Sequence, residues 1–130
     1  MDYTVDIIFI GSADIFVLIQ RETERNLARW PNKIGDYLAS GRLILTNPFG
    51  EIEAYVKKFP EAFIATNFDA ESIASVIKRV YPHKENLLER GKKVREITEN
   101  YMSWRSKAIE VEAFYNHIID RKNRKVNVLE

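Results

Sequence analysis

Three short apolar runs, separated by segments of helical length, leave few folds open to this chain. The runs lie within residues 15–19, 42–46 and 62–66, which we predict to be strands. The first is rich in β-branched residues and apolar at both odd and even positions, which suits a strand buried on both faces of a sheet. Because strands and helices alternate, we predict an α/β fold: a partial Rossmann-like parallel sheet with right-handed crossovers, flanking helices and further helices at the C-terminal end.

The intervening segments carry helix signals. Pro31 suits the first turn of a helix that runs to about Ser40, and Gly41 is typical of the position after a helix C-terminus. Asp69 and Ser103 are N-cap candidates for two later helices. Helices are expected over residues 31–40, 51–59, 70–81, 83–99 and 103–120, with inward side chains Ile34, Tyr37, Leu38, Ile52, Tyr55, Val56, Phe59, Ile73, Val76, Ile77 and Val80.

Two parts of the chain are less regular. Residues 5–10 fit either a further strand or a short helix leading into Asp14. Residues 20–29 are polar and charged with no apolar period, so we expect a loop at the carboxyl end of the first strand. Three strands are few for a doubly wound sheet, and the first strand would leave a hydrophobic edge. A fourth strand, a second chain or the rest of a larger protein would cover that edge.

Composition removes several function classes. The 130 residues include 20 basic and 19 acidic side chains, and this net charge of +1 gives no electrostatic case for nucleic acid or an anionic membrane as the main partner. There are no cysteines, which excludes disulfides, thiolate metal sites and cysteine nucleophiles. The chain shows neither a secretory signal nor an apolar run long enough for a transmembrane segment, so a cytoplasmic location is expected.

The usual catalytic motifs are missing as well. The two histidines, His83 and His117, lie far apart, and neither belongs to a metal-ligand spacing, so no metal site is expected. We expect His83 to be exposed at a helix start and His117 to pack beside Phe114 and Ile118. No nucleophile-elbow or phosphate-cradling glycine motif is present, which argues against a hydrolase triad and a P-loop enzyme.

The segment over residues 30–44 is the most informative one for function. It reads as a loop that delivers a helix N-terminus to the carboxyl edge of the sheet, where free amides and the helix dipole favour a phosphate. Lys33 adds a positive charge in the first turn, and Asp36, about one turn on, could accept hydrogen bonds from a ribose. A nucleotide diphosphate suits this arrangement, although such a helix start is also common without a ligand.

This stretch resembles part of the group 1 glycosyltransferases of family four, which have the GT-B fold. The family typically reads Pro-Asn-Lys, two residues, Glu-Tyr-Leu-Ala, one residue and Gly before a strand, and residues 31–41 here read Pro-Asn-Lys-Ile-Gly-Asp-Tyr-Leu-Ala-Ser-Gly. The similarity continues in order through residues 12–18, 46–52, 69–74 and 101–104, so it covers nearly the whole chain. It implies the C-terminal, donor-binding lobe of an enzyme that transfers a sugar from a nucleotide-diphosphate donor without a required metal or other cofactor.

The resemblance also implies roles for particular residues. Asp36 matches the second acid of the family's Glu, seven residues, Glu pair, which is expected to hold the ribose. Lys33 and the backbone amides around Asn32 match the diphosphate region. The helix dipole there would stabilise the charge that develops on the departing nucleotide diphosphate.

The chain departs from the family pattern in this region. Asp36 is one methylene shorter than the usual Glu, and Ala28 replaces the first acid of the pair. Glu22 and Glu24 lie in the same loop, either as substitutes for that acid or as solvated charges. Trp30 either stacks on a base or sugar or packs beneath the loop.

The sequence thus predicts a partial donor-binding glycosyltransferase domain over residues 1–120 and a loose basic tail over residues 121–130. Relatives carry a Gly-rich turn, a basic Arg/Lys pair and an acceptor lobe before this part, so we expect the chain alone to be inactive. Its expected partners are a nucleotide sugar and either a separate N-terminal glycosyltransferase lobe or a second copy bound through the sheet edge. The family's usual setting is polysaccharide or glycolipid assembly. The alternatives are a non-catalytic α/β interaction module and an engineered fragment.

Overall fold

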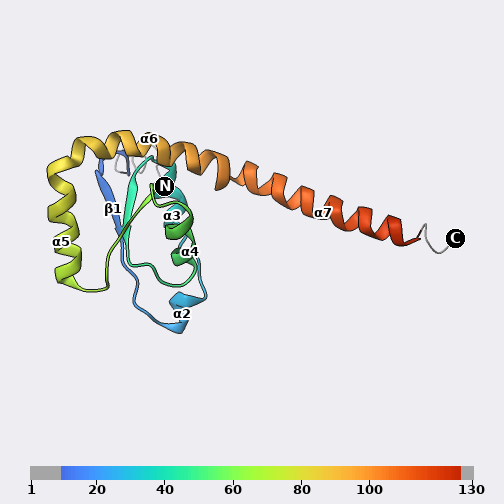
Figure 1. Cartoon of the computed structure of the whole chain (residues 1–130), viewed down its shortest axis with the longest axis horizontal. Coiled ribbons are helices and arrows are strands. Elements are labelled where there is room, and N and C mark those ends of the chain that lie inside the picture. Colours follow the sequence, from blue (N-terminus) through green and yellow to red (C-terminus); the bar gives the residue numbers. More distant parts are fainter. Residues whose placement is uncertain (1–9, 127–130) are drawn as a thin grey trace, which may run out of the picture. The chain divides into compact units, whose positions relative to one another are not determined.

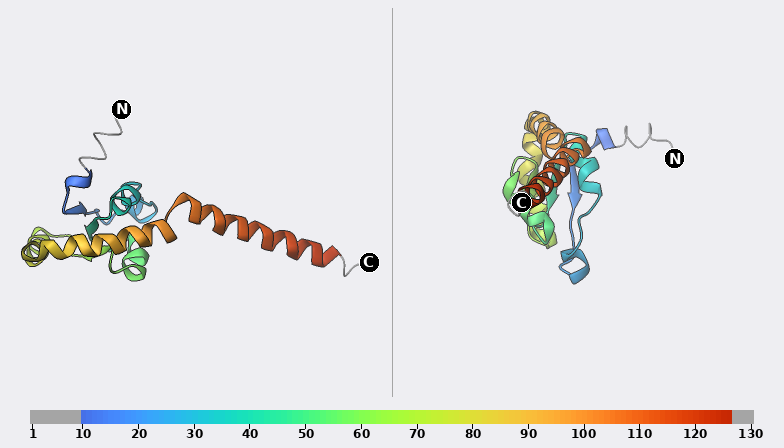
Figure 2. Two further views of the ribbon diagram at one scale, coloured as in Figure 1. Left: turned by 90° about the horizontal axis from the view of Figure 1, so that it is seen from above. Right: turned by 90° about the vertical axis from the view of Figure 1, so that its right-hand side faces the viewer.

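The computed structural model describes residues 10–126 (Figures 1 and 2). Side chains are described up to residue 121. Three strands form a parallel sheet in the order β1-β2-β3: β1 (Ile15–Leu18), β2 (Leu43–Thr46) and β3 (Phe63–Ala65). Each predicted strand is therefore present, one or two residues shorter than predicted. The α/β class, with helices around a parallel sheet, is confirmed.

Helices occupy most of the remaining described chain. Three of them connect the strands: α2 (Glu24–Leu27), α3 (Lys33–Ala39) and α4 (Glu51–Lys58). After β3 come α5 (Ala70–Val80), a 3-10 turn (Tyr81–His83), α6 (Lys84–Tyr101) and α7 (Trp104–Val126).

Three predicted helix boundaries, at Gly41, Asp69 and Ser103, are confirmed by hydrogen bonds or dihedral angles. The predicted start at Pro31 is wrong, because α3 begins at Lys33 with Asn32 as its N-cap. Asp69 Oδ1 accepts from the Ser72 amide at 2.7 Å, and Ser103 Oγ accepts from the Ser106 amide at 3.1 Å. Gly41 follows α3 with a φ of +70°, a left-handed conformation that a residue with a Cβ adopts only at a cost. This glycine lets the chain turn directly from α3 into β2.

The core lies between the sheet and its helices. The four β2 side chains are fully buried, and α3 covers them with Ile34 and Leu38, which are also fully buried. Burying an aliphatic side chain of this size contributes roughly 1.5–3 kcal/mol, so the contact of β2 with α3 is a main source of the fold's stability. Tyr37 is half-buried and stacks on Phe16 of β1 with ring centroids 3.9 Å apart. The prediction for Ile77 is wrong: it is 40% exposed, because Val76 is the one residue of the α5 apolar stripe that is buried.

α6 covers the amino edge of the sheet. Gly91 of α6 approaches Gly41, just before β2, so closely that a Cβ on Gly91 would overlap the Gly41 carbonyl oxygen. One residue earlier on α6, Arg90 Nη2 donates a hydrogen bond to the carbonyl of Glu61, just before β3. Figure 1 shows α6 at this end of the sheet and α2 at the opposite end. The carboxyl edge is therefore left to the connecting loops.

The structure differs from the sequence expectation in the 20–29 loop and adds to it at the N-terminus. The expected loop contains α2, a single helical turn whose N-cap Thr23 accepts from the Asn26 amide at 3.3 Å. This turn depends on local hydrogen bonds and has no apolar face, so hydrophobic periodicity could not reveal it. Residues 10–12 are helical, and the rest of the ambiguous 5–10 segment lies outside the described residues.

The chain divides into two compact units, Met1–Thr98 and Glu99–Glu130. The second unit consists largely of α7, which continues to Val126, well into the segment expected to be a loose tail. That segment contains no glycine or proline to end the helix. His117 is exposed on α7, so the prediction that it packs beside Phe114 and Ile118 is wrong, because both of those side chains are themselves exposed. His83 is exposed, as predicted.

Candidate functional site

Buried polar residues gather where the strands end. Gln20 follows β1, Thr46 and Asn47 lie at the end of β2, and Thr66 follows β3. All four are at least nine-tenths buried, whereas the described core elsewhere is almost entirely apolar. Because the strands are parallel, their carboxyl ends meet at one edge of the sheet. This edge is therefore the polar end of an otherwise apolar core.

Asn47 fixes the start of the 20–29 loop. Its side-chain Oδ1 accepts a hydrogen bond from the Gln20 amide, and its Nδ2 donates to the Gln20 carbonyl, both at 2.8 Å. Beside it, Thr46 Oγ1 donates to the Leu18 carbonyl at 2.7 Å. The last backbone pair of the β1–β2 ladder is Leu18 with Thr46. The side chains thus extend the pairing of these two strands beyond their ends and hold the loop in place.

Some of the buried polar atoms at this edge are not used by the fold. Within residues 10–126, the Gln20 side-chain Oε1 and Nε2 and the Thr66 Oγ1 have no hydrogen-bond partner. Buried polar groups are nearly always paired, and an unpaired one costs about 1–3 kcal/mol. The carboxyl edge therefore holds hydrogen-bonding capacity that the described part of the chain does not satisfy.

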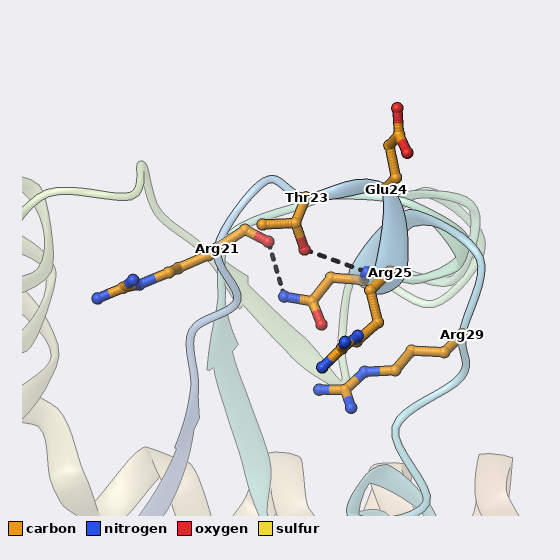
Figure 3. Close-up of a pocket in the computed structure, with 6 residues that line it drawn as sticks. Arg21, Thr23, Glu24, Arg25 and Arg29 are labelled. Carbon is orange, nitrogen blue, oxygen red and sulfur yellow. Dashed lines mark hydrogen bonds between the residues drawn. The ribbon is translucent and has the colours of Figure 1, made fainter.

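An open pocket of about 570 Å³ lies in the loop held by Asn47 (Figure 3). Its lining carries three arginines and one glutamate, a local net charge of 3 − 1 = +2. In Figure 3, the guanidinium groups of Arg25 and Arg29 project into the same region, while the Glu24 carboxylate points away from them. The lining residues are Arg21, Thr23, Glu24, Arg25, Asn26 and Arg29.

Local hydrogen bonds build this pocket. Asn26 Nδ2 donates to the Arg21 carbonyl at 2.8 Å, and its amide donates to Thr23 Oγ1. On the far side, Gly50 has a φ of +60°, and a Cβ there would meet the carbonyl oxygens of Asn26 and Leu27 at 3.2 and 3.0 Å. The α2 turn is thus seated against the loop that follows β2, and its arginines are presented from a defined backbone.

The three guanidinium groups are free to bind an anion. All three arginines are exposed, and in the part of the chain that the structure describes none of them forms an ion pair. A guanidinium is planar and always charged, and its paired N–H groups match the oxygens of a phosphate. The Arg21 guanidinium extends away from those of Arg25 and Arg29 (Figure 3), and the latter two, lying together, suit a ligand with more than one negative charge.

The residues predicted to bind the donor are spread over this edge. Glu24 lines the arginine pocket, and Ala28, in place of the family's first acid, is the C-cap of the same turn. Asn32, Lys33 and Asp36 lie outside the pocket lining, exposed at the start of α3, and Asn32 forms no side-chain cap bond.

Trp30 is half-buried, and its ring lies 4.4 Å from that of Tyr55 on α4. Of the two readings of Trp30, the structure favours packing beneath the loop.

Sequence reasoning missed the arginines and the buried amides. The arginines recur every fourth residue at positions 21, 25 and 29, and this regular spacing was a readable signal. Because no apolar period accompanies this spacing, the segment reads only as a polar loop. Gln20 and Asn47 each directly follow a predicted strand, and nothing in a single sequence separates such residues from exposed loop residues.

Neither a metal-binding cluster nor a membrane-spanning helix is found among the described residues. Nowhere in residues 10–126 do three or more histidine or acidic side chains gather as a metal ion would require. In the same range, no helix combines the length and apolarity needed to cross a lipid bilayer.

Comparison with known proteins gave no match. No protein-family model matches the chain, and neither the curated proteins nor the solved structures contain a match to it.

Proposed function

We propose that this chain binds a nucleotide-diphosphate sugar at the carboxyl edge of its sheet, as the donor-binding part of a glycosyltransferase. The observation that carries the proposal is the pocket formed around Arg21, Arg25 and Arg29, where three guanidinium groups have no carboxylate partner within the described chain. A diphosphate offers several oxygens that accept hydrogen bonds and enough negative charge to balance them. Open α/β sheets bind nucleotides at this edge.

The chemistry of the site would be leaving-group stabilisation. In glycosyl transfer, the bond between the sugar's anomeric carbon and the diphosphate oxygen breaks, and an acceptor oxygen bonds to that carbon. Negative charge then builds up on the nucleotide diphosphate, where fixed positive groups lower the barrier. Arg25 and Arg29 would fill this role, and a separate N-terminal lobe would supply the acceptor and the base that removes its proton.

The start of α3 supports the proposal from the sequence side. Asp36 is exposed and accessible to a ribose, and Lys33 and the amides around Asn32 would add to diphosphate binding. Gln20 offers a donor and an acceptor that the described fold does not use. Trp30, packed on Tyr55, would shape the loop between the arginines and α3.

The test is ligand-dependent thermal stability of the purified chain. UDP, GDP, their sugar conjugates and inorganic pyrophosphate are compared at equal concentration. A ligand that binds only the folded state adds about 2.7 kcal/mol of stability at a hundredfold excess over its Kd. We expect a nucleotide diphosphate to raise the midpoint more than pyrophosphate does, because the base and ribose add contacts.

Matched variants assign the effect to the site. The double variant Arg25→Ala/Arg29→Ala should lose the shift, and Asp36→Ala should weaken it for nucleotides but not for pyrophosphate. Arg79→Ala is the control, since Arg79 is an exposed arginine in the last turn of α5, outside the pocket lining. No shift with any nucleotide would overturn the proposal and favour a non-catalytic scaffold. Equal shifts with pyrophosphate and nucleotides would reduce the site to an anion site.

A further inference from the structure

α7 exposes a continuous apolar stripe. Its apolar residues recur at positions 104, 108, 111, 115 and 118, alternating steps of four and three. Trp104 is 93% exposed, Tyr115 60% and Ile118 45%, and Ala108 and Val111 are also exposed. This spacing is the heptad pattern of the a and d positions in a coiled coil. The helix has 23 residues and is about 34 Å long, or roughly three heptads.

The stripe is wider than the heptad core alone. Phe114 and Ile119 flank it on either side and are 61% and 53% exposed. Soluble monomers rarely expose a large contiguous apolar surface, and one on a single helix marks an interaction site. A free helix of this length is also only marginally stable in water, because most helical stability in proteins comes from burying an apolar face.

We propose that α7 binds α7 of a second copy of this chain as a parallel, in-register coiled coil. With Trp104 and Val111 at d, Lys107 occupies a g position and Glu112 the e position five residues on. In a parallel pair, each g residue faces the e residue of the next heptad on the other helix. Lys107 therefore faces Glu112 of the second copy, and this pairing occurs twice by symmetry.

The next pair along the helix matches in the same way. Phe114 occupies the following g position and faces Ile119 of the second copy, which extends the apolar core. An antiparallel pair would instead set Glu112 against Glu112 and Lys107 against Arg121, and like charges there oppose pairing. The chain's own charge pattern thus selects the parallel arrangement.

A lipid surface fits the helix less well than a second copy. Glu110, Glu112 and Asp120 distribute negative charge along α7, and Glu112 borders the apolar stripe directly. An anionic bilayer would repel this residue, whereas the parallel pair gives it a lysine partner. In the single chain, Lys107 Nζ pairs with Glu110 at 2.9 Å. That exposed pair is worth little and can exchange for Glu112.

Sedimentation equilibrium of the full chain, over a wide concentration range, is the first test. We expect a species of twice the monomer mass, and we expect Ile118→Glu to weaken association by roughly tenfold or more, because it buries a charge in the coil. Ile109→Glu is the matched control. Ile109 is an isoleucine of α7 that is 58% exposed on the other side of the helix, and its variant should dimerise like the wild type.

Single cysteines report the register directly, because the chain has none of its own. Val111→Cys and Ile118→Cys each place a thiol at a d position, where it faces its counterpart only in a parallel, in-register pair. Both variants should form disulfide-linked dimers under mild oxidation, and Ile109→Cys should not. Lys107→Glu should weaken the dimer, and adding Glu112→Lys should restore it.

Three outcomes would overturn the proposal. One is a monomer at every concentration, and another is a dimer that Ile118→Glu leaves intact, which would place the contact elsewhere, such as at the β1 edge. The third is a monomer that binds phosphatidylserine vesicles through the stripe, which would make α7 a membrane-surface helix. None of these outcomes depends on nucleotide binding, so the coiled coil and the donor site are tested separately.

Discussion

The side-chain amide of Asn47 forms two hydrogen bonds with the main chain of Gln20, one in each direction and both at 2.8 Å. The Asn47 side chain therefore takes the place of a backbone partner and continues the β1–β2 hydrogen bonding beyond the point where the strands end. The loop that carries Arg21, Arg25 and Arg29 begins at this anchored residue. The arginine pocket thus depends on a contact between two residues 27 positions apart.

Removing this contact should destabilise the whole fold. Asn47→Ala leaves the amide and carbonyl of Gln20 buried and unpaired, so we expect the free energy of unfolding to fall by about 2–4 kcal/mol. Urea denaturation measures this, with Asn86→Ala as the control, because Asn86 is exposed on α6. The control should lie within about 0.5 kcal/mol of the wild type. An Asn47→Ala midpoint as high as that of the control would show that the contact is unimportant.

Two glycine-to-alanine changes should have opposite effects on stability, because Gly91 is in close contact with Gly41 whereas Gly35 has open space around it. Gly91→Ala should lower the free energy of unfolding by about 1–3 kcal/mol, because the new methyl group overlaps the Gly41 carbonyl and forces α6 away. Gly35→Ala should raise it by about 0.5–1 kcal/mol, since Gly35 lies within α3 and its Cβ would meet no atom within 4 Å. Thermal unfolding of both variants provides the comparison. A stabilising Gly91→Ala would mean that α6 does not cover the amino edge this closely.

The side-chain amide of Gln20, which the described fold does not use, predicts that its removal will raise stability and weaken ligand binding. Gln20→Leu substitutes an apolar side chain of similar size and removes two buried polar atoms that have no partner among the described residues, so the free energy of unfolding should rise by about 1–3 kcal/mol. If this amide contributes to the donor site, the variant should also show a smaller nucleotide-induced shift in Tm. Calorimetry with and without the nucleotide separates the two effects. A variant less stable than the wild type would show that the amide is paired in solution.

The lowered pKa of Asp69 predicts a loss of stability in acid. The backbone amide of Ser72, and then its side chain, donates to this carboxylate and lowers the pKa of Asp69 from its ordinary value of 3.8. The unfolded chain therefore takes up the proton at a higher pH than the folded chain does. The contribution of Asp69 is complete above about pH 3.8 and is lost as the pH falls through the lowered value.

Comparison with Asp69→Asn isolates this titration, because Glu89, whose pKa the hydrogen bond from Lys92 also lowers, titrates in both proteins. Denaturation at a series of pH values should show the wild type's advantage over the variant shrinking below about pH 3.8. A pH-independent difference would contradict the role of the Asp69 carboxylate as a charged cap.

The sequence predicted the strands and most helices because their signals are local and strong. Ile34 and Leu38 lie at helical spacing and are fully buried, and Asp69 and Ser103 cap the helices that they precede. The burial of single residues at the edge of a helix's apolar stripe was less predictable. Ile77 fits the apolar period of α5 as well as Val76 does, but it lies at the edge of the packed stripe and is exposed.

The candidate site was harder to predict because it depends on contacts between distant residues. Nothing near Asn47 in the sequence indicates that its amide will pair with Gln20, and burial of both residues follows only from the assembled sheet. The α2 turn forms through Thr23 and Asn26 side chains, which compete with other local conformations in a single sequence. A resemblance could suggest Asp36 and Lys33, but it could not locate the pocket formed by the arginines.

The position of Gly91 also bears on the order in which the fold assembles during synthesis. Both strand pairs of the described chain lie within residues 15–65, so this sheet is complete in sequence once β3 has left the ribosome. The helix that covers its amino edge follows only when Gly91 emerges, which at cellular translation rates is a delay on the order of seconds. During that interval the amino ends of β2 and β3 are uncovered in the nascent chain. A slow codon or a bound chaperone at this stage would therefore influence the yield of folded protein more than one acting later, while α7 is made.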